Sequence, residues 1–180
     1  MIELEAQKEL GRAKNAVQGY LIRKLLYPKV YLDAEWDGAH ADLLAIDRTG
    51  VGDVHVVRII SVHPHFTPPT HGHELTMASS TKELSRYIEE MRSLSGHFRY
   101  LASVEPGSKS REYYPASNFQ QAALAKDGVG RIGFLLVDLS GDEPAVKVLI
   151  KPERFRSSKQ ITDLADRYVT ENQANWEVRE

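Results

Sequence analysis

The sequence predicts an α/β domain: a mixed β-sheet, built from an antiparallel three-strand meander plus a parallel crossover strand, flanked by helices. Three observations support this prediction. Residues 3–26 have the apolar spacing of a helix, three β-branched runs follow with short connections, and a second helical pattern precedes another strand-like run. Short connections force antiparallel pairing, whereas a strand–helix–strand unit usually returns to a parallel neighbour, so the order of elements predicts the mixed sheet.

The composition is that of one ordinary globular domain. The chain has 180 residues, of which 42% are hydrophobic and 27% charged. No apolar run approaches the ~18 residues that cross a bilayer, so no membrane association is expected. The absence of cysteine excludes a disulfide framework, a thiol nucleophile and an iron–sulfur cluster. The net charge of −2 gives no global attraction for nucleic acid, and the first residues lack a signal-peptide pattern, so the cytoplasm is the expected compartment.

A long helix is predicted at the start of the chain. Leu10, Ala13, Val17 and Leu21 recur at spacings of three and four residues, which places them on one helix face. Pro28 ends the helix, because the residue before a proline is pushed out of the helical region. The apolar face is expected to pack against the sheet.

The meander is predicted from residues 29–36, 41–46 and 54–62, which are rich in β-branched and aromatic side chains. Asp37 and Gly38 form a turn signal between the first two strands, and a glycine-bearing stretch over 48–53 connects the second to the third. Acidic residues are concentrated in this region. The six acids are Asp33, Glu35, Asp37, Asp42, Asp47 and Asp53. They could form a cation site or the solvated edge of the meander.

The rest of the chain is predicted as a crossover and an extension. Ser80 and Glu83 fit the capping box of a helix that Gly96 closes, and residues 98–104 follow as the parallel strand. A short helix over 118–126, a hairpin of strands over 131–139 and 145–151, and a last helix come next. We therefore expect a single domain over residues 1–180, with a core over about 3–104 and a C-terminal hairpin and helix extension over 131–175.

The string from His40 to Asp47 places an aspartate near the start of the second predicted strand, followed by apolar residues and a turn. With the leading helix, the meander and the crossover, this arrangement resembles the core of the PD-(D/E)XK, or restriction-endonuclease-like, nuclease superfamily. The resemblance implies that Asp42 ligates Mg²⁺ or Mn²⁺, and that an acid-x-lysine triplet on the next strand supplies a second carboxylate and a lysine. Such a cation neutralises developing charge and lowers the pKa of its bound water during phosphodiester hydrolysis.

The third predicted strand departs from this family pattern at Arg58. If Arg58 takes the place of the lysine, Val56 stands in the place of the acid; if it takes the place of the acid, Ile60 stands in that of the lysine. Arginine keeps its positive charge but stays protonated, so it cannot accept a proton as a lysine can. Neither register completes the motif, and Arg58 remains the candidate catalytic cation beside Asp42.

An acid from elsewhere in the chain could complete the site. The candidates are Glu5, Glu9, Glu35, Glu83 and Glu90. Of these, Glu9 is the expected catalytic acid and Glu35 the expected second metal ligand beside Asp42. Alternatively, Asp42 is a strand-entry residue whose carboxylate is satisfied by turn amides. A further alternative is that the fold differs from that of the nucleases.

The predicted loop over 63–80 carries two His-x-His pairs, His63 with His65 and His71 with His73. On an extended segment each pair projects both rings to one side, and imidazole suits Zn²⁺ or Ni²⁺. No spacing here matches a named zinc motif. The loop could therefore hold a transition metal, respond to pH, or be a polar, proline-stiffened connection.

A basic segment leads into the last predicted helix. Its members are Lys147, Lys151, Arg154, Arg156 and Lys159. Near a helix N-terminus such side chains can hold phosphates together with the backbone amides, which makes them the expected contacts to DNA or RNA. A solvated surface is the alternative reading of the same charges.

The function that the sequence predicts is that of a degenerate nuclease-fold domain, which binds nucleic acid or protein without a full catalytic site. The first alternative is an active Mg²⁺- or Mn²⁺-dependent nuclease with a relocated acid. The second is a partner-binding protein, unrelated to nucleic acid, whose histidine loop binds Zn²⁺ or Ni²⁺. The sequence carries no signal for an oligomeric state.

Overall fold

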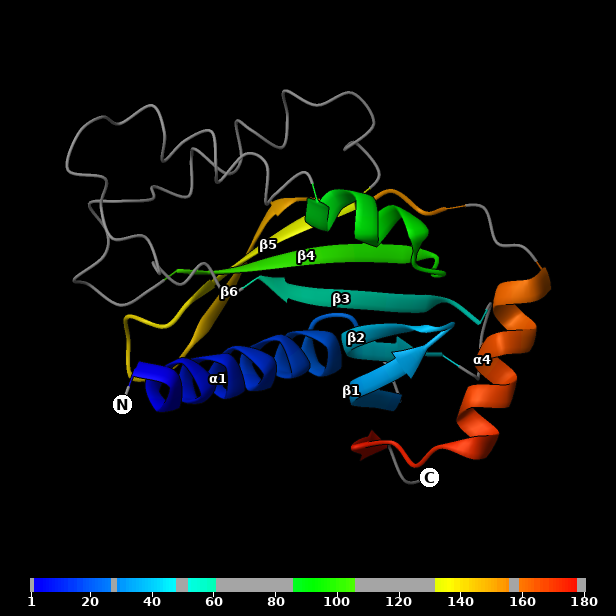
Figure 1. The fold of residues 1–180 in the computed structure, drawn as a ribbon, viewed down its shortest axis with the longest axis horizontal. Coiled ribbons are helices and arrows are strands. Elements are labelled where there is room, and N and C mark those ends of the chain that lie inside the picture. The colour runs from blue at the N-terminus through cyan, green and yellow to red at the C-terminus, as the bar shows by residue number, and fades with distance from the viewer. Residues whose placement is uncertain are drawn as a thin grey trace.

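One β-sheet organises the described part of the chain (Figure 1). The computed structural model describes residues 2–26, 29–47, 52–60, 86–105, 132–155 and 159–177. Their seven strands lie in the order β6-β5-β4-β3-β2-β1-β7. The strands are β1 (Lys29–Trp36), β2 (Ala39–Ile46), β3 (Val54–Ile60), β4 (Phe98–Glu105), β5 (Ile132–Asp138), β6 (Ala145–Ile150) and β7 (Trp176–Glu177).

The pairing of the strands confirms the predicted fold class. β1, β2 and β3 form the antiparallel meander, and β4 lies beside β3 in parallel, as expected for a crossover connection. β5 continues the parallel part next to β4, and β6 pairs with β5 antiparallel as the predicted hairpin. The protein is thus an α/β domain with an open, mixed sheet.

Helices pack on both faces of the sheet. α1 (Ile2–Arg23) is the predicted first helix, and its fully buried Ala13 and Val17 pack against one face together with Leu43 and Ala45 of β2. The other face is covered by a helix over residues 86–93 and by α4 (Lys159–Glu171), which packs at the β1–β2 end of the sheet (Figure 1). Two separate apolar clusters result, one on each face of the sheet.

The C-terminal strand is a feature that the sequence pattern did not predict. The two residues of β7 pair with Lys29 and Val30 on the outer side of β1, and the side-chain oxygen of Asn175 accepts the N–H of Leu32 at 2.7 Å. The predicted loop over 63–80 and the short helix over 118–126 lie outside the described residues. Within the described residues, no helix has the length and apolar character needed to cross a bilayer.

Candidate functional site

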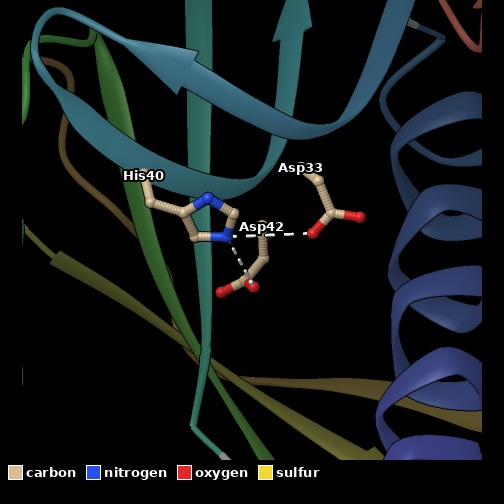
Figure 2. A group of neighbouring side chains, drawn as sticks. All are labelled: Asp33, His40 and Asp42. Carbon is tan, nitrogen blue, oxygen red and sulfur yellow. Dashed lines mark hydrogen bonds and ion pairs between the residues drawn. The ribbon is translucent and has the colours of Figure 1, made fainter.

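The candidate site lies on the first hairpin of the sheet, beside α1. Asp33 of β1 and His40 and Asp42 of β2 offer ligand atoms that all lie within 4.8 Å of one another. The Nε2 atom of His40 is 3.8 Å from Asp33 Oδ1 and 3.4 Å from Asp42 Oδ1, so one imidazole nitrogen faces both carboxylates (Figure 2). Carboxylate oxygens and imidazole nitrogens are metal ligands, and this group could hold a metal ion.

An irregularity of the backbone brings the two aspartates to the same place. Asp33 adopts a φ of 50°, and it is the one position of the β1–β2 ladder left unpaired, opposite Asp42. In a regular strand Ala41 and Leu43 would share a face, yet Ala41 packs in the cluster under α4 and Leu43 in the cluster under α1. The alternation of side chains between the two faces of the sheet is therefore shifted by one residue at this unpaired position. For this reason a sequence pattern of period two does not predict that Asp33 and Asp42 lie together.

The carboxylate of Asp42 already has partners on both oxygens. Its Oδ2 atom accepts the backbone N–H of Ile59 at 2.7 Å and lies 3.8 Å from Arg58 Nη1. Its Oδ1 atom faces His40 and lies 3.8 Å from the ammonium of Lys14. Only 9% of the side chain is exposed, so these contacts replace water for a charge that would be costly to bury alone.

Lys14 supplies a cation from the helix layer. Its ammonium forms an ion pair with Asp33 as well as with Asp42, and its side chain is largely buried. Lys14 is not among the site residues that the sequence predicts. A signal for it exists, because Lys14 continues the apolar stripe of Leu10 and Val17 at helical spacing, and a lysine on a buried face needs a nearby acid.

Arg58 takes the position across from Asp42 on β3. The β2–β3 pairing ends at Leu43 and Val57, and Arg58 follows directly. Its guanidinium donates to the backbone oxygen of His40 at 3.4 Å and lies 3.7 Å from Glu90 Oε2 on the helix over 86–93. A cation of β3 thus stands across from the carboxylate of Asp42.

The predicted relocated acids lie in different places. Glu35 is exposed, and its Oε1 atom is 3.5 Å from His40 Nδ1, the nitrogen that faces away from the two aspartates. A carboxylate at this position can orient the ring, as second partners of metal-bound histidines do. Glu9 lies partly buried on α1 and is not a member of the Asp33, His40 and Asp42 group. The side chains of Glu5 and Glu83 lie outside the described residues.

The other predicted site residues are only partly described. Lys147 of β6 and Lys151 directly after it are exposed. Arg154 forms two hydrogen bonds to Asp53: the Oδ1 atom of Asp53 accepts one from Arg154 Nε at 3.0 Å and one from Arg154 Nη2 at 2.6 Å. Arg156 and the side chain of Lys159, together with His63, His65, His71 and His73, lie outside the described residues.

Comparisons with known proteins add two solved structures. No family model matches the chain, and no curated protein matches it in sequence. SPO1766, a protein of unknown function from Silicibacter pomeroyi, matches at 12% identity with a TM-score of 0.44, over 83% of this chain and 77% of that chain. SfsA from Pyrococcus furiosus, in complex with Ca²⁺, matches at 13% identity with a TM-score of 0.30, over 79% of this chain and 64% of that chain. At these values neither structure assigns a family or an activity to the protein.

Proposed function

We propose that this protein is a degenerate nuclease-fold module that binds nucleic acid and does not cleave phosphodiester bonds. The observation that carries the proposal is the pair of cations around Asp42: Arg58 stands across from it on β3, and Lys14 reaches it from α1. Two internal cations neutralise the carboxylate that the family uses as a metal ligand.

The chemistry of these cations argues against hydrolysis. A divalent ion in a nuclease binds water and lowers its pKa, and it neutralises charge on the phosphate as the reaction proceeds. A guanidinium or an ammonium ion can neutralise a carboxylate but cannot coordinate and activate water. An arginine does not serve as a proton acceptor, so Arg58 does not replace a lysine in that role. The arrangement therefore conserves the electrostatic balance of a metal site and loses its reactivity.

Lys147 and Lys151 are the proposed contacts to nucleic acid. Both are exposed at the edge of the described sheet, whereas the charge of Arg154 is directed to Asp53. Exposed lysines attract phosphates independently of sequence and make binding depend on salt. In the proposal Arg156 and Lys159 extend this basic surface.

Cleavage is tested first. Purified protein is incubated with plasmid, single-stranded DNA and RNA in the presence of Mg²⁺ or Mn²⁺, with Asp42→Asn and Asp33→Asn variants in parallel. We expect no cleavage above the level of the variants. Cleavage that disappears in Asp42→Asn overturns the non-catalytic assignment and supports the metal-dependent alternative.

Binding is tested by retention on immobilised DNA and RNA as the salt concentration rises. The double variant Lys147→Ala with Lys151→Ala should elute at lower salt than the wild type, because about one unit of the salt slope is lost for each phosphate contact. Lys8→Ala with Lys24→Ala, which removes the same charge from exposed positions on and after α1, is the matched control. If the control and the test variant elute together, the basic surface is wrong. If the wild type is not retained on either nucleic acid, the proposed nucleic-acid binding is wrong.

A second candidate function is metal-dependent hydrolysis at the group formed by Asp33, His40 and Asp42. The close approach of their ligand atoms favours it, and Asp33 would be the relocated acid in place of Glu9 or Glu35. An imidazole ligand favours Mn²⁺ or Zn²⁺ over Mg²⁺. Calorimetric titration with each ion tests this candidate, with His40→Ala as the test variant and Asp163→Ala, at an exposed position of α4, as the control. Binding that survives His40→Ala contradicts the site.

The predicted transition-metal loop is tested separately. Elemental analysis of tag-free protein should show Zn²⁺ or Ni²⁺ in a stoichiometric amount if His63, His65, His71 and His73 bind it, and the double variant His63→Ala with His65→Ala should lose the metal. A metal-free wild type after incubation with Zn²⁺ and Ni²⁺ rejects this proposal.

A further inference from the structure

His97 connects three segments at the end of the sheet opposite to the candidate site. It directly precedes β4, it has no exposed surface, and it contacts the residues at the start of β3 and those after β6. Its backbone N–H donates to Val54 O at 2.9 Å, and its backbone oxygen accepts the N–H of Phe155 at 2.8 Å. The junction therefore depends on one buried histidine.

The side chain of His97 is held in one protonation state by its neighbours. The backbone N–H of Val54 donates to Nδ1 at 2.9 Å, so Nδ1 must carry a lone pair and the ring proton must lie on Nε2. Within the described residues the buried Nε2 atom has no hydrogen-bond partner. The neutral ring is thus an obligatory acceptor at Nδ1, and a proton there would face the N–H of Val54.

A second partner for a protonated ring lies close by. The Oδ1 atom of Asp53 is 4.0 Å from His97 Nδ1, and at present it accepts two hydrogen bonds from Arg154. An imidazolium could donate to this carboxylate instead of accepting from Val54. The junction therefore has two alternative hydrogen-bond arrangements that share Nδ1.

We infer that His97 is an acid-sensitive latch. When its ring is neutral, His97 holds the starts of β3 and β4 against the segment over 152–155. When the ring is protonated, Nδ1 no longer accepts the N–H of Val54 and donates to the carboxylate of Asp53 instead. The latch acts on the hydrogen bonds that His97 forms with Val54 and Phe155 and not on the group around Asp42, which lies toward the other end of β3. This inference is independent of the proposed function.

Charged groups on the elements that pack against His97 set the pH at which its ring becomes protonated. Asp53 favours the protonated ring, whereas Arg154 and a protonated His55 oppose it. Burial is the largest influence, and it lowers the pKa of His97 below its ordinary value. Arg99, two residues along β4, directs its guanidinium to the backbone oxygens of Met91 and Arg92 and to the ring of Phe155.

The experiment uses the full chain labelled with ¹⁵N. The ring nitrogen shifts of His97 report which nitrogen carries the proton, and amide hydrogen exchange, corrected for the intrinsic effect of pH, reports the protection of Val54 and Phe155. As pH falls from 7.5 and Nδ1 becomes protonated, both amides should lose at least about tenfold in protection while the amides of β5 keep theirs.

Two variants separate the latch from general acid unfolding. His97→Asn offers a side-chain oxygen near the position of Nδ1 that accepts but does not titrate, so the protection of Val54 should no longer change with pH. Asp53→Asn keeps an oxygen acceptor but removes the negative charge that favours the imidazolium, so protonation of the ring should move to lower pH, whereas Asp163→Asn on α4 should leave it unchanged. If His97→Asn does not fold, the wild type and Asp53→Asn still decide. A proton on Nδ1 at neutral pH, or Val54 protection that does not change when Nδ1 is protonated, overturns the inference.

Discussion

The carboxylate of Asp42 accepts the backbone N–H of Ile59 at 2.7 Å, beyond the point where the pairing of β2 and β3 ends. A side chain thus takes the role of a backbone acceptor between two strands. The same carboxylate faces Lys14 and Arg58. Asp42 is consequently a structural residue in this protein, whatever the group around it binds, and its replacement should affect stability.

Asp42→Ala should destabilise the fold by about 2–4 kcal/mol, because it leaves a buried N–H without an acceptor and two cations without their shared anion. Asp42→Asn keeps an acceptor for Ile59 and should cost about 1–2 kcal/mol. Urea unfolding measures both values. Equal losses for the two variants would show that the hydrogen bond to Ile59 does not contribute.

Lys14→Met should strengthen divalent-cation binding at the group of Asp33, His40 and Asp42 by about tenfold or more, because a positive charge within 4 Å of both carboxylates is removed. Titration with Mn²⁺ at fixed pH measures the change. Lys8→Met, an exposed position on the same helix, is the control for helix stability and net charge. Unchanged affinity in Lys14→Met would indicate that Mn²⁺ binds elsewhere or not at all.

Acid should weaken the fold through His55, whose pKa burial lowers to about 3. Between pH 6.5 and about 3 the unfolded chain binds a proton that the folded chain excludes, so the free energy of unfolding falls as pH is lowered. The slope from this one group approaches about 1.4 kcal/mol per pH unit. His55→Phe preserves a ring next to Phe98 and should flatten the pH dependence of urea unfolding between pH 6 and 4; parallel curves would contradict the assignment.

Gly133→Ala and Gly11→Ala should shift stability in opposite directions. A methyl group at Gly133 would lie 2.8 Å from Tyr100 Cδ1 and 2.9 Å from Pro152 Cδ, and such overpacking costs about 1–3 kcal/mol. At Gly11 on α1 nothing lies within 4 Å, so the better helix propensity of alanine should add about 0.5–1 kcal/mol. Thermal unfolding compares the two, and a loss at Gly11 would be evidence against the exposed helix position.

The three-dimensional arrangement also changes which basic residues are promising contacts to nucleic acid. Sequence spacing placed Arg154 with Lys147 and Lys151, because all three lie in one short segment. Charge density along a sequence does not reveal ion pairs with distant residues, and Asp53 is 101 positions away from Arg154. The retention experiment therefore uses the two lysines alone.

The amino-acid pattern alone predicts α1 and the strands of the meander in their order, since the apolar stripe of α1 and the β-branched runs are local patterns that burial on one face or two faces imposes. It also singled out Asp42 and Arg58 as candidate site residues. The meeting of Asp33 and Lys14 with Asp42 is visible only in three dimensions, because it depends on a positive φ at Asp33 and on the packing of α1 beside the first hairpin. Contacts between layers, and a reset in strand alternation, arise from packing across long sequence separations, so local periodicity does not identify the partners of a residue such as Lys14.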